Sequence, residues 1–231
     1  MGGQSCVLYG GAEFSRDTDL AVLPDPENLA RLQSALDDLE AECIAVPPFE
    51  KRFLDMGLAV HFRCRRADAL GMRVDVMAKM RGVEPFAALW DRRTTVDLDG
   101  ESVDLLSLPD LVKAKKTQRD KDWLVLPRLV EASYFENRDA PTPPRVDFWL
   151  RELRTPELLV EAAASFARER TRVERDRPLL ALAEAGREDE IRRALRDEED
   201  RERDADRQYW KPLRAELERL RAARHARPPA S

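Results

Sequence analysis

The segment DTDLAV, residues 17–22, joins two carboxylates to the start of an apolar run. Because side chains alternate along a β-strand, we expect Asp17 and Asp19 to project from one face. Thr18 and Leu20 then point to the opposite face, into a core. Two aspartates on one face of a strand are suited to a hard, oxygen-liganded cation such as Mg²⁺.

A second short segment, RVDVM at residues 73–77, places Asp75 among apolar residues. Burying a carboxylate costs free energy unless the group is paired or bound to a metal. If this strand lies beside the strand of residues 17–23, Asp75 completes a cluster with Asp17 and Asp19. Such a cluster can bind two metal ions and deprotonate an attacking hydroxyl. The alternative is an edge strand whose Asp75 faces solvent.

Glycines upstream of the aspartates are candidates for phosphate binding. Gly2 and Gly3 precede a helix that we predict over residues 4–14. Small residues at a helix start let backbone N–H groups approach phosphate oxygens. Gly10 and Gly11 lie nearer the aspartates and are competing candidates.

The first 137 residues predict alternating helices and strands, as in an α/β or α+β fold with a mixed sheet flanked by helices. Asp25 followed by Pro26 is typical of a helix start, and Asp99-Gly100 is typical of a hairpin turn. The expected helices cover 4–14, a stretch from residue 26, 108–118 and 121–135. The expected strands cover 17–23, 58–65 with 72–77 as one hairpin, and 94–98 with 102–106 as another.

A charged stretch, KKTQRDKD at residues 115–122, offers cations to an anionic ligand. Lys115, Arg119 and Asp122 are spaced i, i+4, i+7 and share one face if the helix continues. A partly buried lysine and arginine suit triphosphate oxygens, and Asp122 can hold a lysine in place. Lys116 is an equally available cation. The alternative is an ordinary charged helix end.

The segment 138–144 contains three prolines and predicts a linker. Residues 145–231 are almost entirely helix-forming and densely charged, which predicts a helical extension. Residues 188–206 are so polar that we expect a solvated or bridging helix there, or partial disorder. The extension is either a solvent-facing arm or a surface that binds a partner or RNA.

Bulk composition narrows the class of protein. The net charge of −5 excludes a generally basic nucleic-acid binder, so any nucleic-acid partner needs a local basic patch. Cys6, Cys43 and Cys64 are odd in number and lack metal-ligand spacing, which favours a reducing, cytoplasmic location. His61 and His225 are too few for a histidine-based metal site, and we expect His61 to be structural. No apolar run approaches membrane-spanning length, so we expect no membrane partner.

The order apolar residue, Gly-Gly, thirteen residues and Asp-x-Asp resembles the signature of the polymerase-β-type nucleotidyltransferase superfamily. Asp75 matches the third carboxylate of that superfamily. The segments GGQSCVLYG (2–10) and FSRDTDL (14–20) are similar to its AbiEii-type branch, whose members are often toxins of two-gene defence systems. Residues 111–123, with lysine followed by Arg-x-Lys-Asp, resemble a motif of the same branch. The resemblance covers residues 1–137.

This resemblance implies transfer of a nucleoside monophosphate from an NTP to a hydroxyl, with release of pyrophosphate. The acceptor is expected to be RNA, such as the end of a tRNA, or a protein, and a cognate antitoxin is a possible partner. Carried over to this chain, the metal-binding residues of a two-metal Mg²⁺ site are Asp17, Asp19 and Asp75, with Asp75 also the base. The nucleotide-binding residues are Gly2, Gly3, Arg16, Lys115, Lys116, Arg119 and Asp122.

One departure from the superfamily concerns the start of the chain. There the apolar-Gly-Gly unit follows a strand of the sheet, whereas here Met1 holds the apolar position. We expect either a start codon upstream or a lost first strand. The alternative function is an inactive relative that acts as a binding or antitoxin-like protein. A third alternative is a transferase whose acceptor is a small molecule such as an aminoglycoside.

Overall fold

The computed structural model describes residues 1–226, and its contacts divide the chain into two compact units. The strand unit consists of Met1–Val7, Phe14–Ala114 and the residues from Arg207 onward. The helical unit consists of Leu8–Glu13 and Lys115–Asp206. These boundaries differ from the domains expected over 1–137 and 145–231, because the helix before the proline-rich segment packs with the helices after it.

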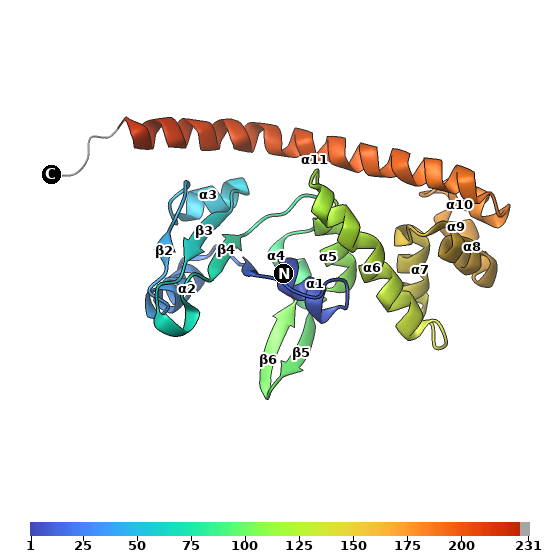
Figure 1. The fold of residues 1–231 in the computed structure, drawn as a ribbon, viewed down its shortest axis with the longest axis horizontal. Coiled ribbons are helices and arrows are strands. Elements are labelled where there is room, and N and C mark those ends of the chain that lie inside the picture. The colour runs from blue at the N-terminus through green and yellow to red at the C-terminus, as the bar shows by residue number, and fades with distance from the viewer. Residues whose placement is uncertain (227–231) are drawn as a thin grey trace. The chain divides into compact units, whose positions relative to one another are not determined.

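The strand unit is built on a mixed sheet, as expected (Figure 1). Within residues 1–226 it has four strands in the order β1-β4-β3-β2. The strands β1 and β4 are parallel, whereas β4 with β3 and β3 with β2 are antiparallel. Their bounds are β1 Asp17–Ala21, β2 Glu42–Cys43, β3 Val60–Arg63 and β4 Arg73–Met77. The predicted hairpin of residues 58–65 with 72–77 is thereby confirmed.

A helix covers the apolar face of this sheet. It is α2, Pro26–Asp38, and it begins as predicted, with Pro26 in its first turn and Asp25 as the cap. The Asp25 carboxylate accepts a hydrogen bond of 2.8 Å from the backbone N–H of Asn28. Leu36 of α2 is buried against Val74 and Val76 of β4. The alternation of β1 is confirmed as well, because Leu20 packs against this same core.

The N-terminal helix is shorter than predicted. It is α1, Gly2–Leu8, whereas the sequence predicted a helix over 4–14. Gly10 has a φ of 74°, a left-handed conformation that a helix cannot contain. Gly11 belongs to the helical unit and packs closely within it, since an added Cβ would lie 2.5 Å from the side chain of Leu129. The two glycines therefore end the helix.

The rest of the strand unit contains short helices and the second predicted hairpin, which is confirmed. Asp110 anchors this region, because its buried carboxylate accepts from Arg92 at 2.6 Å and from the Ser107 hydroxyl at 2.7 Å. The elements are α3 Lys51–Met56, the 3-10 turn η1 Ala67–Ala69, α4 Phe86–Asp91, β5 Thr94–Leu98, β6 Glu101–Leu105 and α5 Leu108–Lys115.

The helical unit packs around aromatic side chains. The rings of Tyr134 and Trp149, from the helices on either side of the proline-rich segment, meet edge to face at 5.2 Å. Trp149 is fully buried. The helices of this unit are α6 Asp120–Asn137, α7 Pro143–Glu152, α8 Pro156–Ser165, α9 Ala167–Val173, α10 Leu180–Glu184 and the first part of α11, Glu188–His225. Residues 138–144 thus join two helices of one unit (Figure 1).

The last helix, α11, is continuous through Pro212 and supplies residues to both units. Its inward positions recur every eleven residues, close to three helical turns. Ile191 and Leu195 are buried in the helical unit, and Leu213 is buried against α3 in the strand unit. The stretch 188–206 is therefore a helix with a buried side, so of the expected alternatives, a solvated helix, a bridging helix or partial disorder, it is neither disordered nor fully solvated. None of the helices in residues 1–226 is both long and apolar enough to cross a membrane.

Candidate functional site

The candidate site is built on the parallel pair β1 and β4. Their register sets Asp17 opposite Arg73 and Asp19 opposite Asp75. Because opposed residues on neighbouring strands share a face, these four charged side chains all project from one side of the sheet. The condition stated for the cluster, that the two strands are neighbours, is met. The alternative, an edge strand with Asp75 in solvent, is wrong, because β4 lies between β1 and β3.

Asp75 is paired within the protein. Its residue is 8% exposed, and its carboxylate accepts from Nη2 of Arg73 at 2.8 Å. Nδ1 of His61, opposite it on β3, lies 2.8 Å from the other carboxylate oxygen. Burial by itself raises the pKa of Asp75, but hydrogen bonds and charge from His61 and Arg73 outweigh burial and hold that pKa below its ordinary value.

These two partners of Asp75 were not predicted to belong to the site. Arg73 has a signal in the sequence, since it stands two residues before Asp75 and strand alternation places both on one face. His61 has a weaker signal, because its position opposite Asp75 depends on the hairpin register. Arg73 keeps an Nε that is buried and has no hydrogen-bond partner in the described residues.

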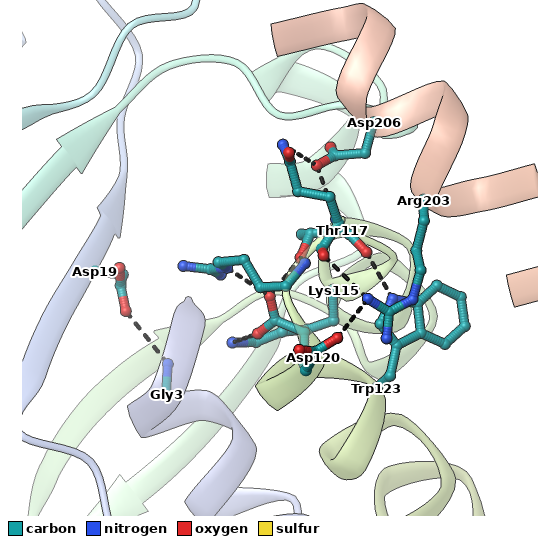
Figure 2. Close-up of polar contacts among 11 residues, drawn as sticks. Gly3, Asp19, Lys115, Thr117, Asp120, Trp123, Arg203 and Asp206 are labelled. Carbon is teal, nitrogen blue, oxygen red and sulfur yellow. Dashed lines mark hydrogen bonds and ion pairs between the residues drawn. The ribbon is translucent and has the colours of Figure 1, made fainter. Parts of the chain in front are cut away.

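The glycine pair packs on Asp19. The backbone N–H of Gly3 donates to Oδ2 of Asp19 at 3.2 Å, as Figure 2 shows. An added Cβ on Gly2 would lie 1.8 Å from the same Oδ2, and one on Gly3 would lie 2.2 Å from Oγ of Ser15. Only glycine fits at both positions. The pair therefore fixes the Asp19 carboxylate, which adds a structural reason for the two glycines.

Asp17 and Arg16 are less constrained. Asp17 is half-buried, and within residues 1–226 its carboxylate has no hydrogen-bond or ion-pair partner. Arg16 is exposed and forms no salt bridge in the same residues. Its guanidinium lies over the ring of Phe14, 5.6 Å from the ring centre. Asp17 and Arg16 thus keep charges that a ligand can engage.

The donor set suits a hard cation, since carboxylate oxygens are the ligands that Mg²⁺ prefers. The positions of the side chains do not yet form a metal centre. Across residues 1–226, no three histidine, cysteine, aspartate or glutamate side chains are arranged to hold a metal ion. Arg73 and His61 occupy the Asp75 carboxylate instead. A cation at this cluster would share or replace the contacts that Arg73 and His61 make with Asp75.

The condition under which Lys115, Arg119 and Asp122 would share one helix face, a helix that continues through them, is not met. The helix α5 ends at Lys115 and α6 begins at Asp120, so residues 116–119 are not helical. Even so, Lys115 and Arg119 both reach Asp122. The 2%-exposed Asp122 carboxylate accepts from Nζ of Lys115 at 3.2 Å and from Nε of Arg119 at 2.7 Å. The Thr117 hydroxyl donates at 2.6 Å.

These contacts change the acidity of Asp122. Burial by itself raises its pKa, but the charge of Lys115, the Thr117 hydroxyl and Arg119 outweigh burial and lower the pKa below the ordinary aspartate value. The group is therefore an anion that holds two cations in place, as the sequence suggested for one lysine. Arg119 remains the more accessible cation, with 55% of its side chain exposed.

The two neighbouring lysines are now distinguishable. Lys115 belongs to the Asp122 cluster. Lys116 instead forms an ion pair of 2.8 Å with Glu152 of α7 and lies 4.0 Å from Glu202 of α11. Both lysine side chains are about as buried as each other, so their partners decide the assignment. Lys115 lies with Arg119 on Asp122, whereas Lys116 pairs with α7 and lies near α11.

Comparisons with protein-family models, with curated proteins and with solved structures find no match to this chain. Its function is therefore argued from its own residues: three aspartates on one face of β1 and β4, and a buried aspartate that holds Lys115 and Arg119.

Proposed function

We propose that this chain is an Mg²⁺-dependent nucleotidyltransferase that moves a nucleoside monophosphate from an NTP to a hydroxyl acceptor. The observation that carries the proposal is the register of β1 and β4, which sets Asp17, Asp19 and Asp75 on one face of adjacent strands. The sequence resemblance calls for three carboxylates in this order, and the mixed sheet with α2 on its other face is compatible with that fold.

Crowding of like charges supports the proposal. Carboxylates on directly opposed residues of neighbouring strands repel each other, and a cation offsets the repulsion. In this structure Arg73 supplies positive charge to Asp75, and a backbone N–H supports Asp19. Bound Mg²⁺ would supply the positive charge that stabilises the triphosphate and the departing pyrophosphate.

The chain's own residues have separable roles in this proposal. Lys115 and Arg119 contact triphosphate oxygens, and Asp122 holds them. Gly2, Gly3 and Arg16 remain proposed phosphate contacts. Lys116, which is also a nucleotide-binding candidate, forms an ion pair with Glu152 and stays a proposed contact.

The proposed reaction balances as a displacement at phosphorus. The acceptor oxygen forms a bond to the α-phosphorus, the bond from that phosphorus to the β-bridging oxygen breaks, and pyrophosphate leaves. The acceptor proton passes to a carboxylate. Asp75 with a lowered pKa is a weak base while Arg73 is bound, so its ligand role is better supported than its role as the base.

The acceptor and the setting stay as the resemblance suggests. We propose RNA or a protein hydroxyl as the acceptor and a two-gene toxin system, with a cognate antitoxin as a partner, in the cytoplasm. The local cations of residues 115–119 are too few and too strongly paired to be a nucleic-acid surface by themselves.

A label-transfer assay tests this function. The chain is incubated with Mg²⁺, each NTP carrying an α-phosphorus label, and total RNA or cell protein. We expect transfer by the chain and at least about a hundredfold less by the Asp17→Ala, Asp19→Ala double variant. The control is Asp91→Ala with Asp200→Ala, which removes two exposed aspartates. Transfer that survives the first double variant would contradict the site assignment.

A specific observation favours a second candidate, an inactive relative that binds a partner. Arg73 and His61 already satisfy Asp75, and the described residues hold no preformed metal cluster. In that case the chain binds no Mg²⁺-NTP. Calorimetric titration of Mg²⁺ with a non-hydrolysable NTP separates the two candidates, because only the enzyme gives a binding signal that the Asp17→Ala, Asp19→Ala variant loses.

A further inference from the structure

The non-helical segment between α5 and α6 is bound by α11. Asp206, which is 2% exposed, accepts from the backbone N–H of Gln118 at 3.0 Å and from its side-chain Nε2 at 3.2 Å. One turn earlier, Nη1 of Arg203 donates to the backbone carbonyl of Gln118 at 3.0 Å. Figure 2 shows Asp206 and Arg203 reaching this segment from α11. Both backbone polar groups of Gln118 are thus held by one helix.

Arg203 is itself locked in place. Its Nε donates to Glu199 at 2.8 Å, and its Nη1 also donates to Asp120 at 2.7 Å. Its guanidinium lies over the ring of Trp123, 5.5 Å from the ring centre. The indole N–H of Trp123 donates to the carbonyl of Thr117 at 2.6 Å. The segment is therefore held along three consecutive residues, 117–119, since the backbone N–H of Arg119 also donates to the Thr117 hydroxyl.

The placement of Asp206 breaks the pattern of its own helix. The residues eleven positions before and after it are Leu195 and Leu217, which are apolar members of the inward stripe. A carboxylate buried at such a position costs free energy unless its hydrogen bonds are satisfied. A leucine there would leave the Gln118 N–H without its acceptor. Asp206 is explained by this segment and not by the packing of α11.

We propose that Asp206 and Arg203 are positioning residues, which hold residues 117–119 so that the backbone of Arg119 is fixed for binding the phosphate groups of a nucleotide. The inference rests on the proposed function, because that function assigns Arg119 a contact with the nucleotide. It assigns a use to the charged middle of α11. Asp122 then fixes the side chains of Lys115 and Arg119, while α11 fixes the backbone between them.

The test uses the full chain with Asp206→Ala, its conservative counterpart Asp206→Asn and the control Asp200→Ala, an exposed aspartate of the same helix. Amide hydrogen exchange of peptides covering 115–123 measures the order of the segment. Steady-state transfer with varied Mg²⁺-NTP measures KM and kcat separately. Arg203→Lys keeps the charge but loses the planar fork, and it serves as a second probe if Asp206→Ala fails to fold.

We expect Asp206→Ala to speed exchange in 115–123 and to raise KM about tenfold with kcat little changed, because Arg119 loses its fixed position. Asp206→Asn retains an acceptor for the Gln118 N–H. Its exchange rate in 115–123 and its KM should therefore both lie close to those of the unaltered chain. Arg203→Lys shifts both in the same direction by less, and Asp200→Ala shifts neither.

Two results would overturn the inference. If exchange in 115–123 does not change in Asp206→Ala or Arg203→Lys, α11 does not order the segment. If exchange rises while KM stays constant, the ordered segment does not serve the nucleotide. If the unaltered chain neither binds nor transfers an NTP, the proposed function fails and the positioning role falls with it, whereas the exchange measurement still reports whether α11 orders the segment.

Discussion

Asp19 of β1 and Asp75 of β4 are directly opposed residues on two parallel strands. Their side chains leave the same face of the sheet, so the strand register brings two like charges together. The protein balances them with different partners, since Asp75 is bound by Arg73 and Asp19 by the backbone N–H of Gly3. The two carboxylates thus lie close together on one face of the sheet, each held by a partner of its own.

Removing Arg73 should weaken the strand unit. In Arg73→Ala the nearly buried Asp75 loses its guanidinium, and we expect the free energy of unfolding to fall by about 1 kcal/mol, since Arg73 is itself partly exposed. Urea unfolding measures it. Arg63→Ala is the control, because Arg63 lies opposite Arg73 on β3 and is exposed. Equal losses in the two variants would show that the Arg73–Asp75 pair is not special.

Replacing Gly2 should disturb the Asp19 carboxylate in addition to straining the backbone. Gly2 and Gly82 have nearly equal φ values, 75° and 76°, but an added Cβ meets Asp19 only at Gly2 and open space at Gly82. Both alanine variants carry a backbone cost of about 1 kcal/mol. We expect Gly2→Ala also to displace the Asp19 carboxylate and abolish Mg²⁺-NTP binding, measured by calorimetry. Binding that is equally retained in both variants would contradict this.

Asp122 should make the helical unit sensitive to acid. Its pKa is lowered in the folded chain, so its stabilisation is complete above about pH 4, the ordinary aspartate value, and is lost as the pH falls through the lower folded value. Between about pH 6 and about pH 3, the unfolding free energy of the unaltered chain should fall relative to that of Asp122→Asn, which cannot titrate. Asp139→Asn, in the exposed α6–α7 connection, should track the unaltered chain.

Arg177 should be a main support of the helical unit. It is 6% exposed, and it donates to the carbonyls of Leu150 and Leu153 at the end of α7 and to Glu198 of α11. Arg177→Met leaves Glu198 with less compensation, and we expect a loss of about 3 kcal/mol in unfolding free energy. The exposed Arg175 provides the control variant Arg175→Ala, which should change stability little. Thermal melting that moves equally in both would refute the assignment.

The sequence predicted the elements that depend on neighbouring residues, namely several strands, two hairpins and one helix start. Strand alternation and turn residues indicated β1, β4 and both hairpins, and the Asp25-Pro26 pair indicated the start of α2. The pairing of β1 with β4 was stated only as a condition for a carboxylate cluster, and the structure meets that condition. The left-handed Gly10, however, ended α1 earlier than its helix-forming residues suggested.

Long-range contacts account for what was missed. The segment KKTQR, residues 115–119, contains no glycine or proline that would end a helix. The break after Lys115 is stabilised by Asp206 and Arg203, more than eighty positions away in sequence. Likewise, His61 meets Asp75 only through the register of β3 with β4. The charge composition of residues 188–206 predicted a solvated or bridging helix, or partial disorder, and could not show which of these charges are buried.

The central claim is nucleotidyl transfer, and the position of the label tests it most directly. The same NTP is supplied once with label on the α-phosphorus and once on the γ-phosphorus, with Mg²⁺ and total RNA or cell protein. We predict that the α-label appears in the acceptor, that the γ-label appears in pyrophosphate, and that both signals are lost in Asp17→Ala, Asp19→Ala. Appearance of the γ-label in the acceptor, or transfer of neither label, would contradict the account.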